Sequence, residues 1–131
     1  QRVKDMGGTT HLFSFYQEAD SLLENYPQCP AGQFRRIQLA RYIIDFDYAR
    51  VDDMIFDKKG RVSDFGVSED VLDRLIESGI PFQTSGCPGK DKRIACCNRP
   101  YGDSRPSDIR SYPFRLEEKD VEKVKEEILT Y

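Results

Sequence analysis

The spacing of apolar residues predicts three helices along the chain. In residues 33–46, Phe34, Ile37, Ala40 and Ile44 recur three or four positions apart, and further apolar positions widen this face, as in a largely buried helix. A second helix is predicted between Ser68, which can cap its N-terminus, and Gly79, which ends it. Residues 117–129 combine a narrow apolar stripe with many Lys and Glu residues, which predicts a surface helix.

Three short apolar runs between these helices favour strands. Residues 9–16 are rich in aromatic and β-branched side chains with little alternation, as expected for a strand covered on both faces. Residues 54–56 form a strand or one arm of a hairpin, because the Lys-Lys-Gly sequence at 58–60 has turn chemistry. Residues 80–84 are predicted to form a strand with Pro81 near its start, where the missing N–H matters least.

The resulting order of strand, helix, strand, helix, strand, helix is that of parallel βαβ units, so we expect an α/β fold. A closed eight-fold βα barrel needs roughly 250 residues, and this chain has 131. We therefore expect a partial (βα) barrel of about three units with mostly parallel strands and a C-terminal helix. Because such a sheet has unpaired edges, we also expect another part of the same protein or a second copy to complete it.

Composition narrows the class of protein. The 33% charged and 38% hydrophobic residues fit one globular domain, and the net charge of -3 offers no basic excess for binding nucleic acid. The apolar runs are too short for a membrane helix. The chain begins at Gln1, which we interpret as a cut end, so residues 1–131 are expected to be a portion of a larger protein. A cytoplasmic location is predicted, since the four cysteines are too few for a secreted disulfide scaffold.

Three of the four cysteines cluster in one Gly- and Pro-rich stretch. Cys87, Cys96 and Cys97 lie within eleven positions, just after the third predicted strand, where α/β enzymes carry their functional loops. Closely spaced thiolates suit iron–sulfur clusters and zinc. Structural zinc sites use cysteine pairs separated by two to four residues, which is not the spacing here. Unligated thiols or a fortuitous disulfide are the alternative interpretation.

Three sequence runs resemble a known family. They are Asp-Met-Gly-Gly-Thr-Thr-His-Leu-Phe-Ser-Phe at 5–15, Gly-Gln-Phe-Arg-Arg-Ile-Gln-Leu-Ala-Arg at 32–41, and the Ser-Gly-Cys-Pro to Cys-Asn-Arg-Pro-Tyr-Gly segment within 84–106. Together they resemble the C-terminal part of biotin-synthase-related radical S-adenosylmethionine proteins, nearest to archaeal-type two-component lipoyl synthase subunits. The resemblance covers about residues 4–112 and depends most on residues 84–106.

This resemblance implies a (βα) barrel whose N-terminal half binds a [4Fe–4S] cluster through Cys-x3-Cys-x2-Cys and cleaves S-adenosylmethionine to a 5′-deoxyadenosyl radical. In sulfur-inserting members an auxiliary iron–sulfur cluster supplies the sulfur. The parent enzyme of this chain is expected to insert sulfur into an unactivated C–H bond of an octanoyl or similar group. Cys87 and Cys97 match the family's C-terminal cysteines and are the candidate ligands. Cys96 departs from the usual single cysteine before Asn-Arg-Pro, so either neighbour could be the ligand. Arg99 and Arg105 could contact the cluster or the substrate, or hold the loop to backbone carbonyls.

The radical-generating motif Cys-x3-Cys-x2-Cys is absent from this sequence. The chain alone is therefore expected to be catalytically silent and to contribute only part of one wall, through residues 11–20, to an S-adenosylmethionine pocket. The implied partners are the missing N-terminal half of the same polypeptide, a second lipoyl-synthase-type subunit, or another copy of this chain. Residues 1–131 are interpreted as one C-terminal domain with a cysteine-containing loop at 84–112.

Other chemically capable residues favour structural roles. His11, the one histidine, stands on an apolar run, where hydrogen-bonded core histidines are more common than ligands or bases. Cys29 is isolated in Pro-Gln-Cys-Pro and is interpreted as an ordinary loop cysteine. Ser107 and Ser111 could ligate iron but are more typical of turns. Three arginines are expected on the solvated side of the first long helix: Arg35, Arg36 and Arg41.

Two alternatives to an enzyme fragment stay open. One is a standalone metal-binding or redox-interaction module that uses Cys87 and Cys96 or Cys97 without radical chemistry. The other is an inert α/β scaffold with free thiols. Iron, sulfide and zinc analysis separates all three hypotheses.

Overall fold

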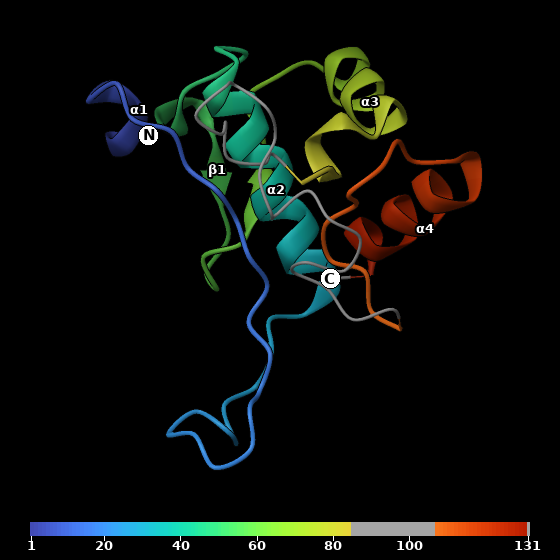
Figure 1. Ribbon diagram of the computed structural model, residues 1–131. Helices are drawn as coiled ribbons and strands as arrows, with labels where there is room; N and C mark the ends of the chain where they lie inside the picture. Colours follow the sequence, from blue (N-terminus) through green and yellow to red (C-terminus); the bar gives the residue numbers. More distant parts are fainter. Residues whose placement is uncertain (85–106, 131) are drawn as a thin grey trace, which may run out of the picture.

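The computed structural model describes residues 1–84 and 107–130 (Figure 1). The three longest helices of the described residues are α2 (Ala31–Asp45), α3 (Glu69–Ser78) and α4 (Glu118–Leu129). The remaining elements are the short helix α1 (Arg2–Asp5), two 3₁₀ turns η1 (Val51–Asp53) and η2 (Ile80–Phe82), and the strands β1 (Ile55–Phe56) and β2 (Val62–Asp64).

The prediction of a partial (βα) barrel with mostly parallel strands is wrong. Within the described residues, the sheet consists of β1 and β2 alone, and these pair antiparallel, so no parallel βα unit is formed there. The one parallel pairing in these ranges is an isolated bridge between Gln83 and Tyr112. The fold is mostly helical because apolar faces of the helices pack on one another and on η2, instead of on a parallel sheet.

Two of the three predicted strands are absent. Residues 9–16 are irregular, and Phe13, which the strand interpretation would bury, is more than half exposed. Aromatic and β-branched composition favours a strand only where a neighbouring backbone is available to pair with it. Residues 80–82 form the 3₁₀ turn η2 instead of a strand. Pro81 stands in its first turn, where a fixed φ and a missing N–H are well tolerated, and it follows Gly79 in the left-handed conformation.

The hairpin alternative for residues 54–56 agrees with the structure. The Asp57 carboxylate accepts hydrogen bonds from the backbone N–H groups of Lys59 (2.8 Å) and Arg61 (3.0 Å), and Gly60 supplies a positive φ of 75°. Arg61 Nε also pairs with Asp57 Oδ2 at 2.5 Å. These contacts close the turn between β1 and β2, and they hold the pKa of the Asp57 carboxyl below its ordinary value, chiefly through the backbone hydrogen bond from Arg61.

The three predicted helices are confirmed. Ser68 occupies the N-cap position of α3, although its side chain makes no capping hydrogen bond, and Glu69 and Asp70 stand in the first turn. Gly79 ends the helix with φ 67°. A capping box begins α4, in which the backbone N–H of Glu117 donates to Asp120 Oδ2 at 3.0 Å. Acidic residues in the first turn suit the positive end of the helix dipole.

The hydrophobic core lies where α2 packs against α4, η2 and β2. In Figure 1, α2 runs through the centre of the molecule with α3 and α4 on the same side. Leu39 and Ile43 of α2, Phe82 of η2 and Val124 of α4 have no exposed surface. They belong to a larger buried cluster that also includes Met54, Val62, Phe65, Leu75, Ile76, Tyr112, Leu116, Val121 and Ile128.

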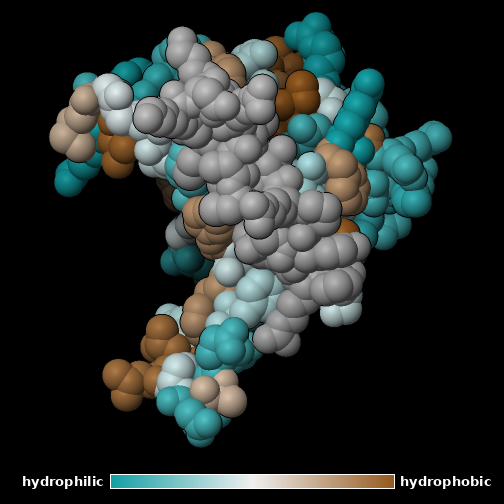
Figure 2. All heavy atoms as spheres, viewed as in Figure 1, coloured by the Kyte–Doolittle hydropathy of each residue, from teal (hydrophilic) through white to brown (hydrophobic). Residues whose placement is uncertain are grey.

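Part of the segment between α1 and α2 (residues 6–30) forms an arm that projects from this core. Figure 1 shows it as the blue lobe extending away from the helices, and Figure 2 shows apolar residues near its tip. Leu22, Leu23 and Tyr26 are exposed there. Phe15 and Tyr26 pack edge to face with ring centroids 6.0 Å apart, which links the two sides of the arm.

Candidate functional site

The two chain segments that flank residues 85–106 are joined by backbone hydrogen bonds. The N–H of Thr84 donates to the carbonyl of Tyr112 at 2.9 Å, and the N–H of Tyr112 donates to the carbonyl of Phe82 at 3.0 Å. The Phe82 side chain has no exposed surface and that of Tyr112 is almost fully buried. Residues 82–84 and 112 therefore form a fixed base from which the cysteine-containing segment departs.

Arg35 of α2 holds the C-terminal side of this base. Its Nη1 and Nη2 donate to the carbonyls of Arg110 (2.5 Å) and Ile109 (2.9 Å), and its Nε pairs with Glu127 of α4 at 2.7 Å. The guanidinium also lies over the Tyr112 ring, 5.3 Å from its centroid. One side chain thus fastens residues 109–112 to two helices.

The expectation that Arg35, Arg36 and Arg41 form a solvated helix face is wrong. Arg35 is only 1% exposed. Arg36 donates to the carbonyls of Val62 (2.7 Å) and Ile128 (3.0 Å), and Arg41 donates to the carbonyl of Thr10 (3.0 Å). The long aliphatic stems of these arginines place the charged groups against backbone carbonyls outside their own helix. Arginines on a solvated helix face would instead extend into water.

Arg110 and Asp108 connect the same base to the arm. Arg110 Nε forms a two-pronged contact with the Asp108 carboxylate at 2.8 and 2.9 Å, and Arg110 Nη1 donates to the carbonyl of Cys29 at 2.9 Å. The Tyr16 hydroxyl donates to the carbonyl of Asp108 at 2.9 Å. Both sides of the arm are consequently attached next to the end of the cysteine-containing segment.

Cys29 is a partly buried free thiol at this junction. Burial raises the pKa of its thiol, and the nearby positive charge of Arg110 opposes that rise. A raised pKa keeps the sulfur protonated, whereas metal binding and nucleophilic attack require the thiolate. This environment agrees with the interpretation of Cys29 as an ordinary cysteine.

The predicted site residues Cys87, Cys96, Cys97, Arg99 and Arg105 lie outside the described residues. Within residues 1–84 and 107–130, no group of three or more His, Cys, Asp or Glu side chains is placed to hold a metal ion.

The two candidate serines differ in environment. Ser107 is exposed in a turn. Ser111 is buried, and its Oγ lies 3.4 Å from Gln38 Nε2. These positions agree with the expectation that the serines serve structure.

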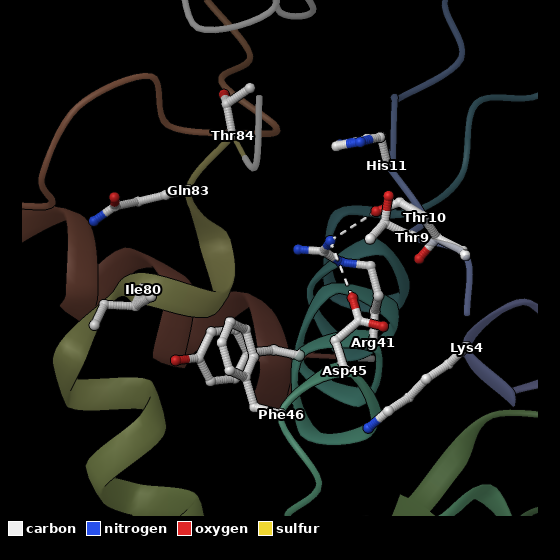
Figure 3. Close-up of a pocket in the computed structure, with 12 residues that line it drawn as sticks. Lys4, Thr9, Thr10, His11, Arg41, Asp45, Phe46, Ile80, Gln83 and Thr84 are labelled. Atoms are coloured by element: carbon white, nitrogen blue, oxygen red, sulfur yellow. Dashed lines mark hydrogen bonds and ion pairs between the residues drawn. The ribbon is translucent and has the colours of Figure 1, made fainter. Parts of the chain in front are cut away.

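A separate cavity of about 470 Å³ lies between α2, the N-terminal segment and η2 (Figure 3). His11 lines it and is half-buried, so it is not the core residue that the strand interpretation favoured. Arg41 and Lys4 also line it, and the sequence interpretation assigned neither of them to a site. A signal was present for Arg41, because it follows Ile37 by four positions and therefore stands on the apolar face of the helix.

Comparison of the chain with protein-family models, curated proteins and solved structures finds no match. No helix in the described part of the chain has both the length and the apolar character needed to cross a bilayer.

Proposed function

We propose that this chain is the C-terminal portion of a radical S-adenosylmethionine iron–sulfur enzyme that inserts sulfur into an unactivated C–H bond, in the manner of lipoyl and biotin synthases. The chain's own part is to hold an auxiliary iron–sulfur cluster through Cys87 and Cys97, with Cys96 as the alternative to Cys97. When bound, that cluster supplies the sulfur. The proposal rests on the residue runs at 5–15, 32–41 and 84–106, and it no longer includes a barrel.

The fixed base at residues 82–84 and 112 is the structural observation that supports this proposal best. A cluster site needs ligands held at set distances by supporting contacts, and described contacts anchor the chain on both sides of residues 85–106. Here the two ends share backbone hydrogen bonds of 2.9 and 3.0 Å. Arg35 adds two hydrogen bonds to the carbonyls of Ile109 and Arg110 on the C-terminal side, and its ion pair with Glu127 ties them to α4.

The donor set between these anchors fits an iron–sulfur cluster chemically. Three cysteines supply the soft thiolates that such clusters bind. Arg99 and Arg105 of the same segment supply positive charge, and positive charge near a cysteine favours its thiolate form. We assign them contacts to the cluster or to the substrate.

Because Cys-x3-Cys-x2-Cys is absent, we propose that the radical-generating cluster and most of the S-adenosylmethionine pocket belong to another part of the parent enzyme or to a second subunit. The fragment alone is then inactive in catalysis. Sequencing the gene upstream of the codon for Gln1 tests this point. An in-frame Cys-x3-Cys-x2-Cys sequence supports a single parent polypeptide, whereas a start codon directly before Gln1 contradicts it.

The second candidate is a standalone metal-binding or redox-interaction module that uses the same cysteines. The core around Leu39, Ile43 and Val124 favours it, since these side chains are fully buried by the chain's own elements. Such a core does not need a neighbouring barrel half for its burial.

Metal analysis of the full chain distinguishes the candidates. After anaerobic reconstitution with ferrous iron and sulfide, we expect bound iron and acid-labile sulfide in the wild type and a loss of both in Cys87→Ala and Cys97→Ala. Cys29→Ala is the matched control and is expected to retain the wild-type content. Unchanged iron in both test variants would contradict the ligand assignment. Zinc at full occupancy, with no sulfide retained, would favour the module.

A further inference from the structure

The cavity beside the C-terminal half of α2 has the size of a small-molecule site. Its volume is about 470 Å³, within the range of roughly 300–1,000 Å³ that is typical of ligand pockets. Figure 3 shows side chains from three parts of the chain around it: Arg41 from α2, Thr9, Thr10 and His11 from the N-terminal segment, and Ile80, Gln83 and Thr84 from the opposite side. All of these residues lie within the described ranges.

The Arg41 guanidinium has unused hydrogen-bond donors at this cavity. Its Nη1 donates to the carbonyl of Thr10 at 3.0 Å and to Asp45 Oδ2 at 3.4 Å. Its Nε is buried and has no hydrogen-bond partner among the residues that the structure describes. Figure 3 shows interactions from Nη1 alone among the residues drawn, and the other terminal nitrogen extends toward the space between α2 and η2. The N–H bonds of Nε and Nη2 are parallel in any arginine, and this fork matches the two oxygens of a carboxylate.

The charges around the cavity favour no more than a monoanion. Arg41 and Lys4 contribute two positive charges, and two carboxylates already balance them, because Asp45 lies near Arg41 and Asp47 pairs with Lys4. The Lys4 ammonium is already engaged by the carbonyl of Ile44 and, at 2.6 Å, by Asp47. The pKa of the Arg41 guanidinium is lowered because burial removes hydration from the charged group, while Asp45 opposes this effect. A ligand with one negative charge, bound to Nε and Nη2, would balance the positive charge of the buried Arg41 guanidinium.

The other walls suit a compact ring. Tyr42 and Phe46 pack with ring centroids 4.3 Å apart and line the cavity together with Ile80. Thr84 Oγ1, across from Arg41 in Figure 3, is also buried and has no hydrogen-bond partner within residues 1–84 and 107–130. Ligand pockets usually combine apolar walls with a few polar groups that can hydrogen-bond the ligand. The apolar side chains and the Arg41 and Thr84 polar atoms give this cavity that composition.

We propose that this cavity binds a small aromatic monocarboxylate, with the carboxylate on the Arg41 fork and the ring against Phe46 and Ile80. The proposal uses no cysteine side chain and does not rest on the proposed iron–sulfur function. It can therefore be tested in the metal-free chain.

Benzoate is a suitable probe, and benzamide is its matched uncharged control. In calorimetric titrations of the reduced full chain with a chelator present, we expect saturable benzoate binding and at least about tenfold weaker benzamide binding, because charge-assisted hydrogen bonds are lost. Arg41→Gln and Arg41→Lys should each weaken benzoate binding by about tenfold or more. Arg115→Gln, at an exposed arginine outside the cavity, should leave it unchanged.

Three results would overturn this assignment. They are equal binding of benzoate and benzamide, wild-type affinity in Arg41→Lys with an unchanged circular dichroism spectrum, and tighter binding of phenyl phosphate than of benzoate. Arg41→Lys keeps the positive charge and removes the guanidinium, including the Nη1 contacts to Thr10 and Asp45. The proposal therefore stays testable if Arg41→Gln does not fold. Because metal is excluded, a failure here is separate from a failure of the cysteine site.

Discussion

Replacement of Arg35 by Met tests how the base of the cysteine-containing segment is held. Met retains much of the apolar stem but removes the guanidinium that contacts Glu127 and the carbonyls of Ile109 and Arg110. Gln38 Nε2 still donates to the Arg110 carbonyl at 3.0 Å, and Lys123 still lies 3.9 Å from Glu127. The substitution therefore leaves the Ile109 carbonyl and most of the Glu127 carboxylate without compensation.

The expected loss of stability is large for a single substitution. Removing one partner of a buried ion pair destabilises a protein by about 3–5 kcal/mol. We expect Arg35→Met to lower the free energy of unfolding by about 3 kcal/mol, the lower end of that range, because Lys123 and Gln38 keep partial contacts. The stacking of the guanidinium on Tyr112 is lost as well.

Urea unfolding followed by circular dichroism in a reducing buffer measures this change. Arg115→Met, at an exposed position, is the control and is expected to stay within about 0.5 kcal/mol of the wild type. The double variant Arg35→Met with Glu127→Gln should recover part of the loss, since no uncompensated carboxylate remains. A loss below about 1 kcal/mol in Arg35→Met would refute the role assigned to this side chain.

Further predictions concern the turns and the core. Gly79→Ala should destabilise by about 1–2 kcal/mol, more than Gly60→Ala, because both glycines have positive φ but only at Gly79 would a Cβ lie 3.0 Å from the Leu116 side chain; equal losses in urea titrations would refute the steric part. Leu39→Ala, at a side chain with no exposed surface, should cost about 2–5 kcal/mol by the same assay, and a loss below about 1 kcal/mol would contradict its place in the core. Because the pKa of Asp57 is lowered in the fold, its ionised form contributes stability above the unfolded pKa near 3.8, and this contribution disappears as pH falls through the folded pKa. Asp57→Asn should therefore be less stable than the wild type at pH 7, with the difference shrinking below about pH 4; a difference that does not change with pH would contradict the ionic contribution.

The helices could be predicted from the sequence because their signals are local. Apolar spacing identified α2, and Ser68 and Gly79 marked the ends of α3. The turn chemistry at residues 58–60 indicated the hairpin for the same reason. Each signal depends on residues within a few positions of one another.

The predictions for two strands and for the arginines of α2 are wrong because strand pairing and side-chain burial depend on residues far away in the sequence. Residues 9–16 have strand-like composition, but no described segment pairs with them in a ladder. Arg35 is buried because Ile109, Arg110 and Glu127, all more than seventy positions away, offer acceptors for its donors. Such acceptors cannot be read from helical spacing. The cysteine cluster and its arginines lie outside the described residues, so that part of the candidate site stays a prediction from sequence.

The central claim is that the cysteines of residues 85–106 hold an iron–sulfur cluster. Mössbauer spectroscopy of the anaerobic chain, reconstituted with isotopically enriched iron and sulfide, tests it most directly because the spectrum reports the coordination of the iron. We predict signals of tetrahedral, sulfur-coordinated iron in the wild type that disappear in the double variant Cys87→Ala with Cys97→Ala. Spectra of iron coordinated only by oxygen or nitrogen in the wild type, or sulfur-coordinated iron at equal intensity in both proteins, would contradict the claim.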